Sequence, residues 1–177
     1  MTTPLDLMKT LQQYLQGLTK DMALGSGIPP NIYLVDLPAR DVPSYDPPAE
    51  GTDMPPPPSS PPPETTFPNE NDERWPFILI VFSDPAEDNE EGYRTMQMDL
   101  IFGCEGRGSD GYMDVLHLME FVRASFLRET YDGWPARLIR PLSYGFYEEQ
   151  ADPFWMGYMS TTWEAPSMVQ EVWKDGY

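Results

Sequence analysis

The chain has 177 residues, a formal net charge of −18 and a pI near 4.1. This charge excludes a surface that grips nucleic acid tightly, because phosphate binding depends on Lys and Arg displacing counterions. The hydrophobic content of 40% is enough to fill one core, so the length predicts a single domain over 1–177. No apolar run approaches the roughly 20 residues of a membrane span, and the N-terminus lacks the order of a secretory signal. We therefore expect a protein made in the cytoplasm that has no membrane partner.

The first segment predicts a helix over about residues 4–23. Thr3, Pro4 and Asp6 have the order of a helix start: a hydroxyl cap, proline at the first position and an acid in the first turn. Apolar residues then recur every three or four positions, at Leu7, Leu11, Tyr14, Leu15, Leu18 and Met22. The glycines and prolines of residues 25–30 should end the helix.

A short β-branched and aromatic run, residues 31–37, predicts the first strand. The composition then changes, because residues 38–74 are rich in proline, serine and acids and poor in large apolar groups. Proline donates no N–H to a sheet and favours extended polyproline-II geometry, so this segment predicts a long acidic arm.

The next segments predict a strand pair. Residues 75–82 are almost continuously apolar, as expected of a strand buried on both faces. Residues 94–103 alternate polar and apolar at their start and predict an antiparallel partner strand. The loop between them is acidic, at Asp84, Glu87, Asp88, Glu90 and Glu91.

The last third of the chain predicts a helix and further strands. A glycine-rich turn at 105–111 precedes a helix over about 112–127, whose apolar residues have helical spacing. Residues 137–142 contain Pro141 and predict an edge strand, and residues 154–163 predict a final strand. The element order indicates an α+β fold with a mostly antiparallel sheet, two main helices packed on one face, and the proline-rich arm.

The titratable residues do not form a recognisable catalytic or metal site. His117, the single histidine, lies in the second predicted helix, and a lone thiol such as Cys104 is typically a small core residue. The acidic loop lacks the alternating ligands of a calcium loop. We expect no enzyme activity, no metal and no cofactor. The loop is either a solvated turn or, facing a channel, a surface that repels passing DNA.

Two stretches resemble bacteriophage tail-terminator (tail-completion) proteins of siphophages. Residues 111–123, Gly-Tyr-Met-Asp-Val-Leu-His-Leu-Met-Glu-Phe-Val-Arg, are similar to the segment that opens a helix in that family. Residues 153–166 are similar to the family's later strand, and the strand ending at Gly103 also fits. The similarity covers roughly residues 75–167, and the long arm departs from the family pattern.

The resemblance implies a virion structural protein at the head-proximal end of the tail. Such a subunit forms a ring, typically a hexamer, that stops polymerisation of the tail tube protein and joins the neck or head-completion protein while DNA passes without tight binding. An acidic ring agrees with that role. Interface candidates among the aromatic residues are Trp155, Tyr158 and Trp163, although strand alternation places Tyr158 opposite the other two, so that one set could be core. Pro55, Pro58 and Pro61 could strap neighbouring subunits together.

Two other functions are compatible with the sequence. A different neck or head-completion subunit would also form rings. An acidic inhibitor that mimics DNA would act instead as a monomer or dimer with a basic partner.

Overall fold

The computed structural model describes residues 2–25, 27–39, 72–83, 86–89, 92–128 and 134–167. The first helix, α1, spans Pro4–Thr19. A reciprocal capping box starts it: the Asp6 N–H donates to the Thr3 hydroxyl at 3.1 Å, and the Thr3 N–H donates to the Asp6 carboxylate. The helix ends before residue 23, because the Met22 N–H turns back onto the Thr19 carbonyl at 2.9 Å. Met22 fits the apolar spacing of the helix but lies outside it.

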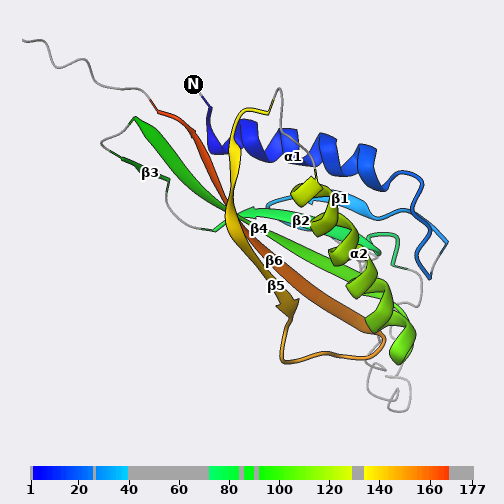
Figure 1. The fold of residues 1–177 in the computed structure, drawn as a ribbon. Coiled ribbons are helices and arrows are strands. Elements are labelled where there is room, and N and C mark those ends of the chain that lie inside the picture. Colours follow the sequence, from blue (N-terminus) through cyan, green and yellow to red (C-terminus); the bar gives the residue numbers. More distant parts are fainter. Residues whose placement is uncertain are drawn as a thin grey trace, which may run out of the picture.

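The sheet has the order β1-β2-β4-β6-β5, with the two-residue strand β3 paired to β4 (Figure 1). Its strands are β1 (Asn31–Leu34), β2 (Phe77–Phe82), β3 (Glu87–Asp88), β4 (Tyr93–Glu105), β5 (Arg137–Phe146) and β6 (Phe154–Pro166). All pairs are antiparallel except β1 with β2, which run parallel. The predicted α+β fold with a mostly antiparallel sheet is therefore confirmed.

One face of the sheet packs against both helices and forms a single core. Alternation along each strand turns every second side chain toward the helices, including Ile78, Leu100 and Met159. Leu7, Leu11 and Leu15 of α1 join them in the same buried cluster. The second helix, α2, spans Ser109–Arg128 and adds Val115, Leu118, Met119, Val122 and Phe126. Both helices thus cover the same face.

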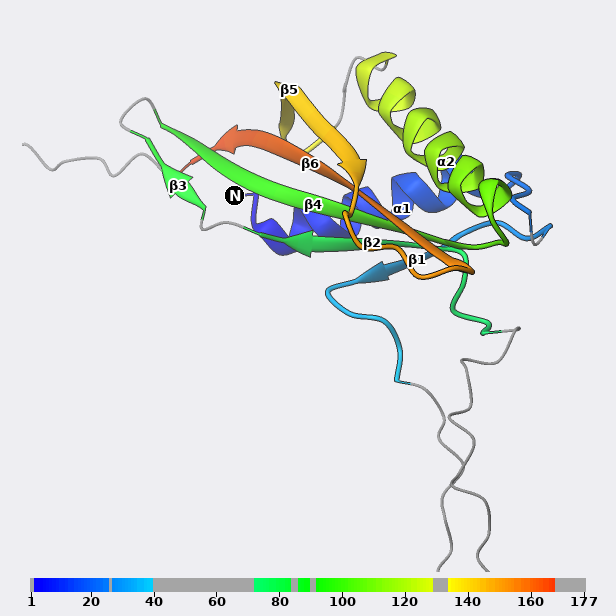
Figure 2. The same cartoon turned by 90° about the horizontal axis from the view of Figure 1, so that it is seen from below.

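The opposite face carries no helix among the described residues, as Figure 2 shows with the sheet seen nearly edge-on. We call it the helix-free face. Alternation assigns to it Tyr33, Phe77, Leu79, Val81, Asp99, Ile101, Met156, Tyr158 and Ser160. Phe77 and Leu79 are buried but lie outside the core cluster, in agreement with this assignment.

Two glycines allow α2 to approach β6 closely. A Cβ atom on Gly111 would lie 2.3 Å from Cδ1 of Trp155, and one on Gly157 would lie 2.6 Å from the sulfur of Met119. At Gly111 the Gly106 carbonyl oxygen would also lie only 2.5 Å from the Cβ atom, so a side chain there would push helix and strand apart. At Gly157 the flexible end of the Met119 side chain would have to move.

Several predicted boundaries are corrected. The first strand ends at Leu34 and not at 37, because Val35 has a φ of +68° and the Asp36 N–H turns back to the Leu34 carbonyl. The acidic loop contains the short strand β3, which the sequence pattern does not predict. The strand around Pro141 is an edge strand, as predicted, but it is longer and changes register between Ile139 and Ser143.

Candidate functional site

The three candidate interface aromatics fall into different environments. Trp163 is fully buried, and its ring stacks on Trp134 with centroids 5.4 Å apart. Its interpretation as an interface residue is therefore corrected to a core residue. Trp155 is partly buried against the core, and its indole N–H donates to the Gly106 carbonyl at 3.0 Å. Tyr158 alone lies on the helix-free face, so the predicted split of the three residues between two faces is confirmed.

Only part of the predicted acidic loop is described. Glu87 and Asp88 form β3 and are exposed. Arg94 donates two hydrogen bonds of 2.8 Å to Asp88, and the Ser167 hydroxyl donates a third. The Arg94 hydrogen bonds, followed by that from Ser167, lower the pKa of Asp88 to about 2. Asp84, Glu90 and Glu91 lie outside the described residues, as do Pro55, Pro58 and Pro61.

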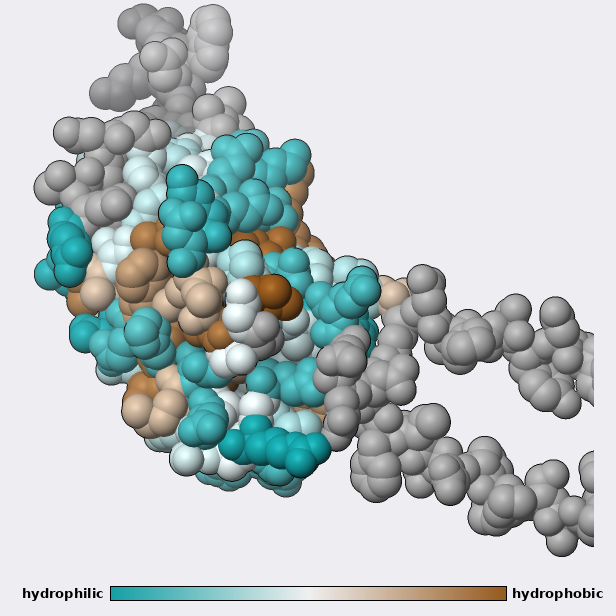
Figure 3. Space-filling view, turned by 90° about the vertical axis from the view of Figure 1, so that its right-hand side faces the viewer, coloured by the Kyte–Doolittle hydropathy of each residue, from teal (hydrophilic) through white to brown (hydrophobic). Residues whose placement is uncertain are grey.

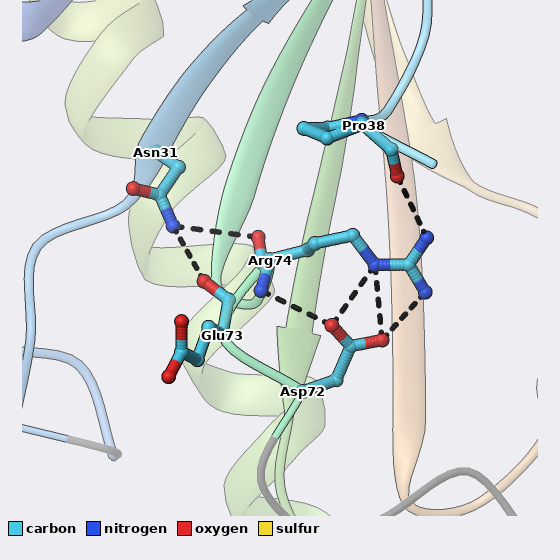
Figure 4. Close-up of polar contacts among 5 residues, drawn as sticks. All are labelled: Asn31, Pro38, Asp72, Glu73 and Arg74. Carbon is cyan, nitrogen blue, oxygen red and sulfur yellow. Dashed lines mark hydrogen bonds and ion pairs between the residues drawn. The ribbon is translucent and has the colours of Figure 1, made fainter. Parts of the chain in front are cut away.

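The two ends of the arm meet in one polar cluster, the arm base, formed by Asn31, Pro38, Asp72, Glu73 and Arg74 (Figure 4). The Arg74 guanidinium donates to the Asp72 carboxylate at 2.6–3.1 Å and to the Pro38 carbonyl at 3.2 Å. The Asn31 side-chain amide donates to the Glu73 carbonyl at 3.0 Å. The Asp72 hydrogen bond raises the pKa of Arg74. These contacts tie both ends of the arm to the start of β1.

An acidic hollow of about 640 Å³ lies beside the arm base. Its acids are Asp72, Glu73, Glu105, Asp110 and Asp114, with Arg107 and Trp75 also in the wall. Asp114 accepts a hydrogen bond from the Gly25 N–H at 2.9 Å. Figure 3 shows hydrophobic side chains across the middle of one end of the molecule, bordered by hydrophilic ones. Within the described ranges, no group of three acids, histidines or cysteines is placed to hold a metal ion.

The centre of the helix-free face combines apolar groups with one carboxylate. Asp99 lies between Val81 of β2 and Ser160 of β6, and its Oδ1 atom is buried without a hydrogen-bond partner. Tyr147 and Tyr158 lie beside it, with ring centroids 5.4 Å apart. Burial raises the pKa of Tyr147, and the negative charge of Asp99 raises it further. The arrangement presents an unsatisfied acceptor next to two tyrosine rings.

Sequence reasoning missed Asp99. The available signal was an acid in the middle of the otherwise apolar second half of β4, at a position that alternation turns away from the core. The arm base was also missed, because the meeting of Pro38 and Arg74 depends on how the chain returns from the arm.

His117 and Cys104 differ in their surroundings. His117 is exposed on α2. Cys104 is buried in the core, as predicted, and burial raises its pKa to about 12, so the thiol stays protonated. Among the described residues, no helix combines the length and apolar character that crossing a bilayer requires.

A comparison with known protein families finds no matching family model, and no curated protein matches the chain.

Proposed function

We propose that the chain is a virion structural protein, a tail terminator. In this proposal its copies form a ring, expected to be a hexamer, on the head-proximal end of the tail tube. The ring stops polymerisation of the tube, joins it to the neck, and lets DNA pass without tight binding.

The observation that carries the proposal is that the two segments with the family-like pattern pack directly against each other. The first, residues 111–123, forms most of α2, and the second forms β6. Tyr112 contacts Trp155 edge to face, with centroids 5.9 Å apart, and Gly111 leaves room for that indole. This contact supports the interpretation of the two segments as one packing unit.

The charge of the chain gives a second line of support. A net charge of −18 disfavours adhesion to phosphates, as a conduit for DNA requires. Glu87 is exposed on β3, and the Arg94 hydrogen bonds keep Asp88 ionised well below neutral pH. Both acids stand at the end of the long β4–β6 ribbon that projects past the helices (Figure 1).

The arm base gives a third line of support, since it couples the arm to the sheet. A partner that pulled on the arm would act through Arg74 and Asn31 on the edge strand β1. In an assembly protein, such contacts would connect the arm to the folded body.

Deletion of the gene in a phage that encodes it tests the proposal. Electron microscopy of lysates should show overlong tail tubes beside DNA-filled heads without tails, and supplying the protein from a plasmid should restore normal particles. Adding the purified chain to tail tube protein that is polymerising in vitro should also shorten the tubes.

Other outcomes assign other functions. Tails of normal length beside unjoined heads would assign the chain to the neck. Intact infectious particles from the deletion phage would overturn any structural role and favour the acidic inhibitor.

A further inference from the structure

The helix-free face is aromatic at the end that adjoins the arm base. The Trp75 ring packs on those of Phe77 and Phe154, with centroids 4.8 and 4.9 Å apart. Trp75 and Phe77 lie over Gly103 of β4, where a Cβ atom would be only 2.3–2.6 Å from their rings. Tyr33 adds a ring on the same face from β1. We call Tyr33, Trp75, Phe77 and Phe154 the aromatic cluster.

The aromatic cluster is covered only in part. Phe77 is buried, whereas Tyr33, Trp75 and Phe154 are half-buried and keep contact with solvent. The Tyr33 hydroxyl and the Trp75 indole N–H are not hydrogen-bonded to another described residue. Aromatic surfaces with available donors bind proline-rich segments, because proline rings pack on aromatic rings and proline carbonyls accept hydrogen bonds.

The arm contains a segment of this kind, residues 54–63, which we call the proline run. Seven of its ten residues are proline and none is charged, although the arm is acidic on both sides of it. Like charges on two copies of an acidic chain repel each other. The proline run is therefore the part of the arm that can approach another copy most readily.

The position and length of the arm favour the aromatic cluster of another copy. Residues 35–39 and 72–76 leave the sheet on the side away from α2, where the helix-free face lies (Figure 2). At the 3.1 Å rise of polyproline II, residues 64–71 alone span about 25 Å. About 25 Å along β4 from Gly103, the same face is polar, with Thr95 on β4 and Glu164 on β6. A proline-rich chain is stiff over several residues, so it carries the proline run past its own aromatic cluster.

We propose that the proline run of one copy packs on the aromatic cluster of a neighbouring copy, where its carbonyls accept hydrogen bonds from Tyr33 and Trp75. The inference rests on the proposed association of copies and adds the surface at which the arm of one copy meets the next. A contact between two different surfaces of the chain can repeat from copy to copy around a ring.

Photo-crosslinking between copies of the full chain tests this inference. The crosslinker p-benzoylphenylalanine replaces Phe154 or, as the control, Phe121, which is exposed on α2 on the other side of the sheet. Unlabelled chain with the crosslinker is mixed with ¹⁵N-labelled chain without it and irradiated, in solution and again with polymerised tail tube protein. Mass spectrometry should find residues 54–63 of the labelled chain attached at position 154 and not at position 121.

Variants of the arm and of the aromatic cluster complete the test. Pro58→Ala and Pro61→Ala each remove two methylene groups, so each should weaken the contact roughly tenfold if the ring is buried there. Pro43→Ala, outside the proline run, should leave the yield of attachment unchanged. Trp75→Leu keeps an apolar side chain but removes the indole, and should lower the yield as the proline variants do. Circular dichroism checks that each variant is folded.

Several results would overturn the inference. Attachment of the proline run only within one chain, seen as unlabelled product, would place it on its own copy. Equal attachment at positions 154 and 121, or no attachment in either condition, would remove the contact altogether.

The outcome is separable from that of the proposed function. Attachment between copies that do not shorten tail tubes would keep this contact and contradict the terminator. Shortened tubes without attachment would support the terminator and overturn this contact.

Discussion

Two helical glycines have opposite roles. A Cβ atom added to Gly17 in α1 would have no neighbouring atom within 4 Å, whereas one added to Gly111 in α2 would lie 2.3 Å from Trp155 and 2.5 Å from the Gly106 carbonyl. Glycine at position 17 therefore costs backbone entropy without a packing benefit, and glycine at position 111 permits the contact between α2 and β6.

The two alanine variants should change stability in opposite directions. Gly17→Ala should raise the free energy of unfolding by about 0.5–1 kcal/mol. Gly111→Ala should lower it by about 1–3 kcal/mol through overpacking. Urea denaturation followed by circular dichroism measures both, and equal effects would contradict the assigned contact.

Asp99 should limit the stability of the free chain. Asp99→Val removes a buried oxygen without a partner and places a β-branched residue in a strand, so the unfolding free energy should rise by about 1–3 kcal/mol. Ser160→Val, a neighbouring substitution on the same face, serves as the comparison and should change stability less. A loss of stability in Asp99→Val would show that the carboxylate has a partner in solution.

At the scale of elements, hydrophobic periodicity predicted the helices and the central strands. The stripe of α1 and the alternation in β4 reflect burial of one side of each element, and the apolar run of β2 reflects burial on both faces. A local sequence pattern records each of these. The parallel pairing of β1 with β2 and the contact of Pro38 with Arg74 were not predictable. Both depend on the path of the chain between distant segments.

The arm base should contribute more stability than an exposed ion pair. The Asp72 side chain is only 7% exposed, so Arg74→Ala removes the guanidinium partner of a buried carboxylate and should cost about 1.5–3 kcal/mol. Hydrogen exchange in β1 should also become faster. Arg123→Ala is the matched control, because its pair with Glu120 is one-third exposed and should contribute less than about 1 kcal/mol.

The β3 pairing should make stability depend on pH in the acidic range. The pKa of Asp88 falls from its ordinary value of 3.8 to about 2 in the folded chain, so its contribution is complete above pH 4 and is lost as the pH falls toward 2. The melting temperature of Asp88→Asn should therefore fall less than that of the wild type between pH 4 and pH 2. Parallel slopes for the two proteins would contradict the Arg94 pairing.

At the scale of the whole molecule, the order of the predicted elements gave the fold class, and the hydrophobic content predicted one core. Trp163 shows the limit of this reasoning, because a tryptophan suits a core and an interface equally well until its neighbours are known. Asp99 shows a different limit, because its unpaired oxygen can be recognised only when the neighbouring side chains are known. The proposed assembly role comes from the family-like pattern and stays a prediction.

The net charge of −18 should make the folded chain sensitive to salt. Repulsion between like charges destabilises a compact state, and added ions screen it over about 10 Å at 0.1 M. The melting temperature should therefore rise between about 20 and about 200 mM sodium chloride. A melting temperature that falls with added salt would mean that favourable ion pairs outweigh the repulsion.

The parallel alignment of β1 and β2 has a consequence for the length of the arm. Antiparallel neighbours can be joined by a tight turn, but a chain that leaves one strand and enters a parallel neighbour must travel back along the sheet, which takes about a dozen residues or more. Residues 35–76 provide this return path, so part of the arm is an obligatory connection and only the excess is optional. Natural variants of the chain should thus be free to lengthen the arm, while shortening should stop near that minimum, where the return path and the edge strand would be lost together.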